Sequence, residues 1–320
     1  MTRFVVLLAV FLSLAGSTVA ADRYLVIVSG ASGEPEYVER YAGWCDALVE
    51  AFTTRMAIDP THIDVLREGA DEEHASTAEN TKRTLTALRQ KMRADDLAMI
   101  VLIGHGTFDG VEAKFNLVGP DLTSAQWAAL LESVPGRIVL VDTTAASFPF
   151  LEAVSGPRRI VITATDSAAQ RFDTVFPGYF ARAFADDAAD LDKNGRVSIW
   201  EAFLSASLGV RRYYEQRGQI ATERPLLDDN GDGQGREAGA EGTDGAEASR
   251  TYFDADLGIA APTDEQLILL LQKRAALQID AEDLKQRKVL MTPAEYAQEF
   301  ERLMIDIART ERAIRQRQKT

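Results

Sequence analysis

The fold is decided by the sequence LAMIVLIGHG at residues 97–106, an apolar run that ends in Gly-His-Gly. The run is apolar at successive positions, which is typical of a strand that is buried on both faces of a sheet. Three other stretches follow the same pattern, namely RYLVIVSG at 23–30, RIVLVD at 137–142 and RRIVITAT at 158–165. These four stretches predict the centre of a mostly parallel sheet.

The segments between the predicted strands have helical spacing of their apolar residues. We expect helices at 36–52, 76–92, 123–134, 176–188 and 199–216, and a short strand at 63–66. Strands that alternate with helices form a parallel sheet covered by helices on both faces. The fold class predicted is therefore a three-layer α/β sandwich. In such sheets the functional site lies at the carboxyl ends of the strands.

The composition and the N-terminus narrow the function classes. The chain has 320 residues, with 35 Lys and Arg against 49 Asp and Glu, a net charge of −14. This acidity argues against nucleic acid or anionic lipid as a partner. Residues 1–20 have the charged start, the apolar run and the small residues of a signal peptide, and the run is too short for a stable membrane span. We expect a secreted or periplasmic protein.

The rest of the chain divides into three parts. Residues 21–216 are expected to form the α/β domain, and its single cysteine, Cys45, to be buried inside a helix. Residues 217–262 are acidic and rich in glycine, which predicts a loop or linker. Residues 263–320 carry two capping-box patterns and apolar stripes, which predict a coiled-coil-like helical hairpin. The hairpin either packs on the domain or offers an apolar seam to a partner helix.

Chemically useful residues follow two of the predicted strands. His105 stands between two glycines at the end of the 97–103 run, where a general acid or base would be placed. The 137–142 strand ends at Asp142, and Thr143, Thr144 and Ser147 follow it. If the two strands are neighbours, these hydroxyl groups lie near His105.

This arrangement resembles the caspase/legumain-type cysteine peptidases of clan CD, and is closest to bacterial, secreted legumain-like members. The resemblance covers residues 23–216 and rests on the His-Gly pair, the strand that ends at Asp142, and flanking sequence such as Gly33-Glu34-Pro35-Glu36-Tyr37. It implies that His105 is the base and that the N–H of Gly106 belongs to the oxyanion hole. It places the nucleophile at residue 144, where the family has cysteine and this chain has Thr144.

The missing thiol decides the functional prediction. A threonine hydroxyl is a far weaker nucleophile than a thiolate and needs a strong adjacent base. The sequence therefore predicts a pseudopeptidase that binds a peptide or protein in the groove at the strand ends. The alternative is an active hydrolase in which His105 activates the hydroxyl of Thr144, Thr143 or Ser147.

A calcium loop is predicted on residues alone. The twelve residues from Asp190 to Glu201 match the EF-hand loop, with glycine at position 6 and Glu at position 12. The predicted ligands are Asp190, Asp192, Asn194, Arg196 through its carbonyl group, Ser198 and Glu201. A second stretch repeats only the first half of such a loop. It predicts either a weaker cation site or an acidic turn at Asp228, Asn230 and Asp232.

Overall fold

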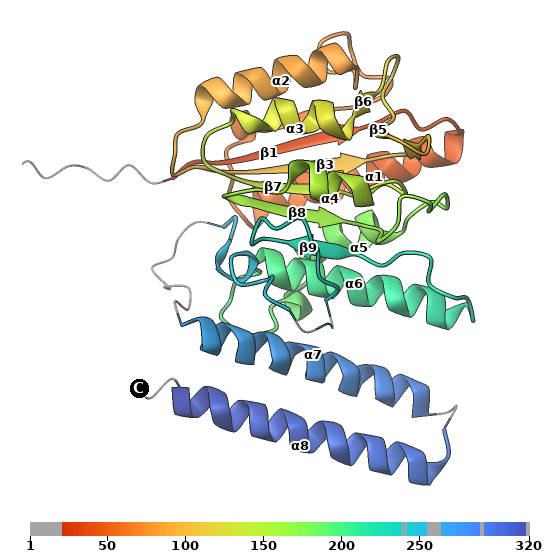
Figure 1. Ribbon diagram of the computed structural model, residues 1–320, viewed down its shortest axis with the longest axis vertical. Coiled ribbons are helices and arrows are strands. Elements are labelled where there is room, and N and C mark those ends of the chain that lie inside the picture. The colour runs from red at the N-terminus through yellow and green to blue at the C-terminus, as the bar shows by residue number, and fades with distance from the viewer. Residues whose placement is uncertain (1–20, 239, 241, 255–263, 289–290, 318–320) are drawn as a thin grey trace, which may run out of the picture.

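The computed structural model describes residues 21–238, 240, 242–254, 264–288 and 291–317. Its centre is a six-stranded sheet in the order β2-β1-β3-β7-β8-β9 (Figure 1). The first five strands are parallel and β9 is antiparallel to β8. The strands are β1 (Arg23–Ser29), β2 (Ile63–Leu66), β3 (Leu97–Ile103), β7 (Arg137–Asp142), β8 (Arg159–Thr163) and β9 (Leu226–Asp228). The prediction of a mostly parallel sheet is confirmed.

Helices cover both faces of this sheet, as the doubly apolar strands require. Alternate side chains of β1 separate two cores: Leu25 and Ile27 face one, and Val26 and Val28 face the other. The first core is covered by α1 (Pro35–Thr54), α5 (Phe176–Ala183) and α6 (Ile199–Gln216). The second is covered by α2 (Ala78–Lys91), α3 (Ser124–Glu132) and α4 (Phe148–Val154). The three-layer prediction is confirmed.

Between β3 and α3 the chain forms a small antiparallel sheet that the sequence analysis did not predict. Its strands are β4 (Gly106–Phe108), β5 (Ala113–Phe115) and β6 (Leu122–Thr123). Runs of two or three residues are too short to show alternation of apolar and polar side chains. The small sheet starts directly after His105 and so borders the strand ends.

The segment predicted as a linker is in part a piece of the domain. Within 217–262, β9 pairs with β8 at the edge of the main sheet, and Leu227 is fully buried. Ala248 and Phe253 are also buried in the core that α1, α5 and α6 cover. The acidic composition suggested a solvated linker, but Asp229 is buried. Its carboxylate accepts hydrogen bonds from the N–H groups of Gly245 and Ala248. The carboxylate holds a turn in place and does not mark a solvated linker.

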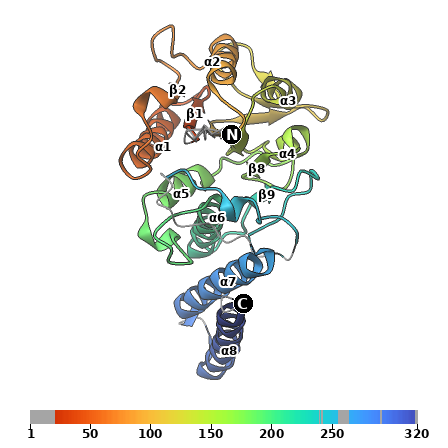
Figure 2. The same cartoon turned by 90° about the vertical axis from the view of Figure 1, so that its left-hand side faces the viewer.

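The C-terminal helices α7 (Glu265–Arg287) and α8 (Pro293–Arg317) form the predicted antiparallel hairpin. Ala275 of α7 packs on Leu204 of α6, so the hairpin is stacked on the domain. Leu284 and Leu303 pack between α7 and α8. Helix α8 is therefore the layer farthest from the sheet, as Figures 1 and 2 both show.

Two expectations concern the membrane and export. None of the helices in the described part of the chain is long and apolar enough to cross a bilayer. The predicted signal peptide, residues 1–20, lies outside the described residues.

Candidate functional site

The strand order places one site at the point where the sheet changes direction. From β1 the chain passes first to β2 on one side and later to β3 on the other. Loops that leave neighbouring strands in opposite directions open a crevice at their carboxyl ends. Ser32 follows β1 there, and His105 follows β3. The predicted base therefore lies at the switch point of the sheet.

His105 is held on both ring nitrogens. Its Nε2 lies 3.2 Å from the hydroxyl of Tyr41 and 3.1 Å from the carbonyl oxygen of Ser32. Its Nδ1 lies 3.3 Å from a carboxylate oxygen of Asp173. In the tautomer with its proton on Nδ1, the ring donates to Asp173 and Nε2 accepts from Tyr41. In the other tautomer, Nε2 donates to the carbonyl oxygen of Ser32. The imidazole is oriented by a carboxylate, as the base of a hydrolase is.

Two tyrosines of α1 complete the surroundings of the imidazole. The Tyr37 ring stands edge-on to His105 at 4.8 Å between centroids, and the Tyr37 hydroxyl donates to Asp173. That hydrogen bond raises the pKa of Tyr37 to about 12, and burial raises the pKa of Tyr41 further. Both phenols therefore remain hydrogen-bond donors at neutral pH. The cavity among these groups is only about 10 Å³, which is room for one water molecule at most.

The predicted nucleophile position faces away from solvent. Thr144 is 0% exposed, and its hydroxyl has no hydrogen-bond partner among the described residues. A β-carbon added to Gly106 would lie 2.4 Å from the Thr144 hydroxyl oxygen, so the hydroxyl packs against the Gly106 backbone. The N–H of Thr144 donates to Asp142, and burial raises the pKa of Asp142 to about 7. The site thus brings His105, Gly106, Asp142 and Thr144 to adjacent strand ends.

The hydroxyl groups of Thr143 and Ser147 form hydrogen bonds with the main chain. Thr143 donates to the carbonyl oxygen of Leu102 at 2.7 Å. Ser147 accepts from the N–H groups of Ala164 and Thr165 at 3.1 and 3.2 Å. Both side chains are almost fully buried. In the described part of the chain, no hydrogen bond joins His105 to Thr143, Thr144 or Ser147.

Three side chains that contact His105 were not predicted from the sequence as its partners. Asp173 lies in the loop after β8, and Tyr37 and Tyr41 lie on α1, so neither spacing nor motif connects them with residue 105. The one signal available is that loops after parallel strands converge at one edge of the sheet. The prediction that Cys45 is buried inside a helix is confirmed, and this burial raises the pKa of its thiol to about 11.

The predicted calcium loop brings three carboxylates together. One oxygen from each of Asp190, Asp192 and Glu201 lies within 4.8 Å of the others. Burial raises the pKa of Glu201 to about 7, and the neighbouring Asp192 contributes. Burial also raises the pKa of Asp192. Crowded carboxylates of this kind, here one buried and two partly buried, are the oxygen ligands that calcium takes, and a divalent cation would offset their repulsion.

The rest of the loop fits the same pattern. Gly195 has φ +84°, the left-handed conformation that position 6 requires. Asn194 donates from its amide nitrogen to Asp192, and its amide oxygen, which accepts from the N–H of Arg196, keeps a second lone pair for a cation. The Arg196 side chain turns away and forms an ion pair with Asp254, which leaves only its main chain for the loop. Ser198 is the N-cap of α6 and shares a capping box with Glu201.

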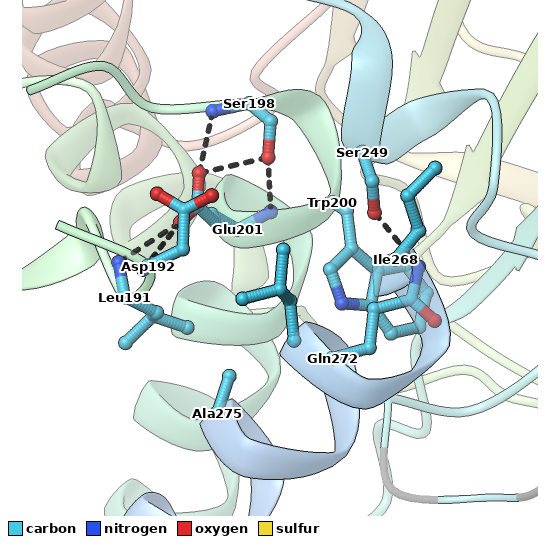
Figure 3. Close-up of a pocket in the computed structure, with 10 residues that line it drawn as sticks. Leu191, Asp192, Ser198, Trp200, Glu201, Ser249, Ile268, Gln272 and Ala275 are labelled. Atoms are coloured by element: carbon cyan, nitrogen blue, oxygen red, sulfur yellow. Dashed lines mark hydrogen bonds between the residues drawn. The ribbon is translucent and has the colours of Figure 1, made fainter. Parts of the chain in front are cut away.

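A cavity of about 30 Å³ lies between this loop and α7 (Figure 3). Asp192, Ser198 and Glu201 line one side, and Ile268 and Gln272 of α7 line the other. Its size is sufficient for one or two water molecules next to the carboxylates. The hairpin is therefore in direct contact with the predicted metal loop.

The second acidic stretch is tightly folded on itself. Asp228 accepts from Gly231 and Gly233, and Asn230 and Asp232 accept from main-chain N–H groups two residues ahead. Asp228 belongs to β9 and is 1% exposed. Hydrogen bonds of this kind also occur in acidic turns that hold no cation. The geometry is compatible with either prediction for this stretch.

Comparisons with known proteins give structural likeness alone. No protein-family model and no curated protein matches the sequence. Protein GSU0716 from Geobacter sulfurreducens is similar with a TM-score of 0.39 and 15% identity, over 65% of this chain and 92% of that chain. Caspase-1 from Spodoptera frugiperda is similar with a TM-score of 0.45 and 7% identity, over 65% of this chain and 86% of that chain. The architecture itself is mixed α/β, with a mostly parallel six-stranded sheet and a C-terminal helix pair.

Proposed function

We propose that this chain is a caspase/legumain-like pseudopeptidase that binds a peptide or protein at the strand ends without cleaving it. One observation carries the proposal: the side chain at the nucleophile position, Thr144, is fully buried and forms no hydrogen bond with the base. A hydrolase needs its nucleophile and base within hydrogen-bond reach of each other. His105 instead contacts Tyr41, Ser32 and Asp173.

Exposed apolar side chains near the strand ends support a binding role. Phe172 is 67% exposed in the loop that carries Asp173, and Phe148 is 39% exposed at the start of α4. Val38 on α1 is 48% exposed beside Tyr37. These side chains follow or adjoin elements that meet at the carboxyl ends of the sheet, where ligands of such folds bind.

Calcium is the second part of the proposal. Asp190, Asp192, Asn194, Ser198, Glu201 and the Arg196 carbonyl group would hold the ion. Bound calcium would neutralise the buried carboxylates and fix the start of α6, which packs against the sheet. Extracellular calcium concentrations suit loops of moderate affinity, with Kd near 10⁻⁴–10⁻³ M. This agrees with export of the mature chain to the periplasm or the medium, which we propose on the signal-peptide pattern of residues 1–20.

An active hydrolase is the competing function. It is favoured by the Asp173–His105 contact, since a histidine oriented by a carboxylate supplies two of the three members of a catalytic triad. It would require the Thr144 side chain to turn out of its contact with Gly106, or a water molecule to act as nucleophile.

Peptide-library digestion read by mass spectrometry separates the two functions. The chain from Ala21, at millimolar calcium, is compared with His105→Ala and with the matched surface variant His74→Ala. We expect no cleavage by any of the three proteins. Cleavage that His105→Ala abolishes and His74→Ala retains would overturn the proposal.

Binding is tested separately from cleavage. Peptides that the chain retains from the same library are titrated by calorimetry against the chain, His105→Ala and Phe172→Asp. We expect Phe172→Asp to weaken binding by about tenfold because it places a charge on the apolar rim. Equal affinity for all three proteins would place the ligand elsewhere.

A further inference from the structure

Helix α8 carries two stripes of residues on opposite sides. The inner stripe packs on α7 through Tyr296, Phe300, Leu303 and Ile307, and buried Ile314 continues its spacing. The outer stripe repeats every three or four residues and is exposed throughout. It consists of Ala294, Gln298, Glu301, Ile305, Ala308, Arg312 and Arg315. A helix of this kind presents a second continuous seam, of the spacing that pairs helices in coiled coils.

The centre of the outer stripe is apolar. Ile305 is 42% exposed, and Met304 beside it is 44% exposed. Ala308 lies one turn further along the same stripe. Large apolar side chains exposed together at the middle of a surface helix are typical of a contact site. In Figures 1 and 2, α8 is the outermost layer, and no ribbon of a described residue covers its outer side.

Charge is divided along α8 in a way that selects the partner. The first half of the helix carries Glu295, Glu299 and Glu301 against one arginine. The second half, from Asp306 onward, carries four arginines against Asp306 and Glu311. Two copies of such a helix repel each other when parallel and attract each other when antiparallel. A second copy of this same chain is therefore complementary to it.

The residues of the outer stripe also pair correctly when a twofold axis relates two copies of α8. When two α8 helices lie antiparallel with Ile305 of one copy opposite Ala308 of the other, Glu301 faces Arg312. In the same register Gln298 faces Arg315. A twofold interface requires that each such contact occur twice, and the order of the stripe satisfies this requirement on both sides of the centre.

We propose that α8 is a homodimerisation helix that pairs antiparallel with α8 of a second copy through Glu301, Ile305, Ala308 and Arg312. A helix of 25 residues is about 37 Å long, and one helix pair buries less than an interface of standard size. The dimer is therefore weak, with a Kd of about 1–100 μM. Its exposed ion pairs make it weaker at high salt.

Charge reversal tests both the surface and its register. Glu301→Arg puts Arg opposite Arg312 of the second copy, and Arg312→Glu puts Glu opposite Glu301. Each variant alone is repulsive, but an equimolar mixture restores both pairs, and so does the double variant. The control is Lys82→Glu, which changes the charge by the same amount as Arg312→Glu. Lys82 is exposed on α2, at the opposite end of the molecule from α8. Sedimentation velocity over a concentration series measures each Kd.

We expect each single reversal to raise the Kd at least about tenfold, and the mixture, the double variant and Lys82→Glu to keep the wild-type value. Ile305→Lys, which places a lysine next to the axis, is expected to abolish association. A wild-type chain that is monomeric at about 100 μM would overturn the proposal. Single reversals that behave as Lys82→Glu does, or a mixture that fails to associate, would overturn it as well. Circular dichroism establishes that each variant is folded.

Discussion

The carboxylate of Asp173 lies 3.3 Å from Nδ1 of His105 and also accepts a hydrogen bond from the Tyr37 hydroxyl. Three parts of the chain meet in this contact: the end of β3, the loop after β8 and helix α1. Of the side chains of Asp173, His105 and Tyr37, only that of Asp173 interacts with both of the others through hydrogen bonds or charge. The orientation of the imidazole therefore depends on a loop residue that the sequence does not connect with it.

Replacing Asp173 by asparagine is expected to change the tautomer of His105. The amide still accepts from Tyr37, but the charge that favours a proton on Nδ1 is lost. Stability should change by less than about 1 kcal/mol, since the Asp173 side chain is 39% exposed and such pairs are screened by solvent. Ring-nitrogen shifts in NMR spectra report the tautomer.

Arg171→Gln, in the same loop, is the control for this change. The chain has only three histidines, so His105→Ala assigns the signal. Unchanged ring-nitrogen shifts in Asp173→Asn would mean that Tyr41 and Ser32 alone hold the ring.

The ends of β3 and β7 were predictable, and their surroundings were not. Apolar runs of six or seven residues place His105 and Asp142 at strand ends, because periodicity and length suffice to identify a doubly buried strand. The direction in which a side chain points depends on packing. Thr144 turns toward Gly106, and no local sequence signal distinguishes that conformation from one that faces the crevice.

The pH dependence of stability should contain a contribution from Asp142. Burial raises its pKa from the ordinary value of 3.8 to about 7, so the folded state holds a proton that the unfolded state releases. The contribution to stability is complete below pH of about 4 and is lost as pH rises to about 7, by up to ~4 kcal/mol. Urea denaturation at a series of pH values measures it.

Asp142→Asn is expected to remove this part of the pH dependence. The asparagine keeps an oxygen for the N–H of Thr144 and carries no charge at any pH. The unfolding free energy of the variant should therefore fall less than that of the wild type over the same range. Parallel curves for the two proteins would show that Asp142 is ionised in the folded state throughout.

The convergence of Asp190, Asp192 and Glu201 in the predicted calcium loop could be anticipated from sequence spacing. Its ligands lie within twelve residues, so spacing alone fixes which side chains can converge. The edge strand β9 is the opposite case. Leu226 and Leu227 join the sheet through contacts with β8, and a three-residue strand has no periodicity to detect.

Calcium is expected to raise the stability of the chain. A loop with Kd near 10⁻⁴–10⁻³ M at about 10 mM calcium adds roughly 1–3 kcal/mol. Glu201→Gln should remove most of this gain because it neutralises the only ligand that binds bidentate. Asp187→Asn, an exposed acidic residue just before the loop, is the matched control. The melting temperatures of the wild type and both variants are measured with calcium, with magnesium and with a chelator.

Isothermal titration calorimetry counts the calcium ions that each protein binds. One bound ion in both the wild type and Asp228→Asn would assign the second acidic stretch as a turn. Equal melting temperatures with calcium and with chelator would exclude the predicted metal site.

The contact between Gly106 and Thr144 yields the last prediction. In Gly106→Ala the new β-carbon would lie 2.4 Å from the Thr144 hydroxyl oxygen and 2.9 Å from its β-carbon. Overpacking of this kind costs about 1–3 kcal/mol of unfolding free energy. Thr144→Ala removes a buried hydroxyl and a buried γ-methyl group, so alone it should cost about 1 kcal/mol.

The double variant distinguishes a direct contact from a general loss of packing. With the Thr144 oxygen gone, the shorter of the two clashes disappears, and the β-carbon contact remains. We therefore expect the double variant to recover about 1 kcal/mol of the cost of Gly106→Ala. Urea denaturation of the wild type, the two single variants and the double variant gives the coupling free energy between residues 106 and 144. Additive effects would mean that Thr144 already turns away from Gly106 in solution, toward the crevice beside His105, and would favour the hydrolase over the binding module.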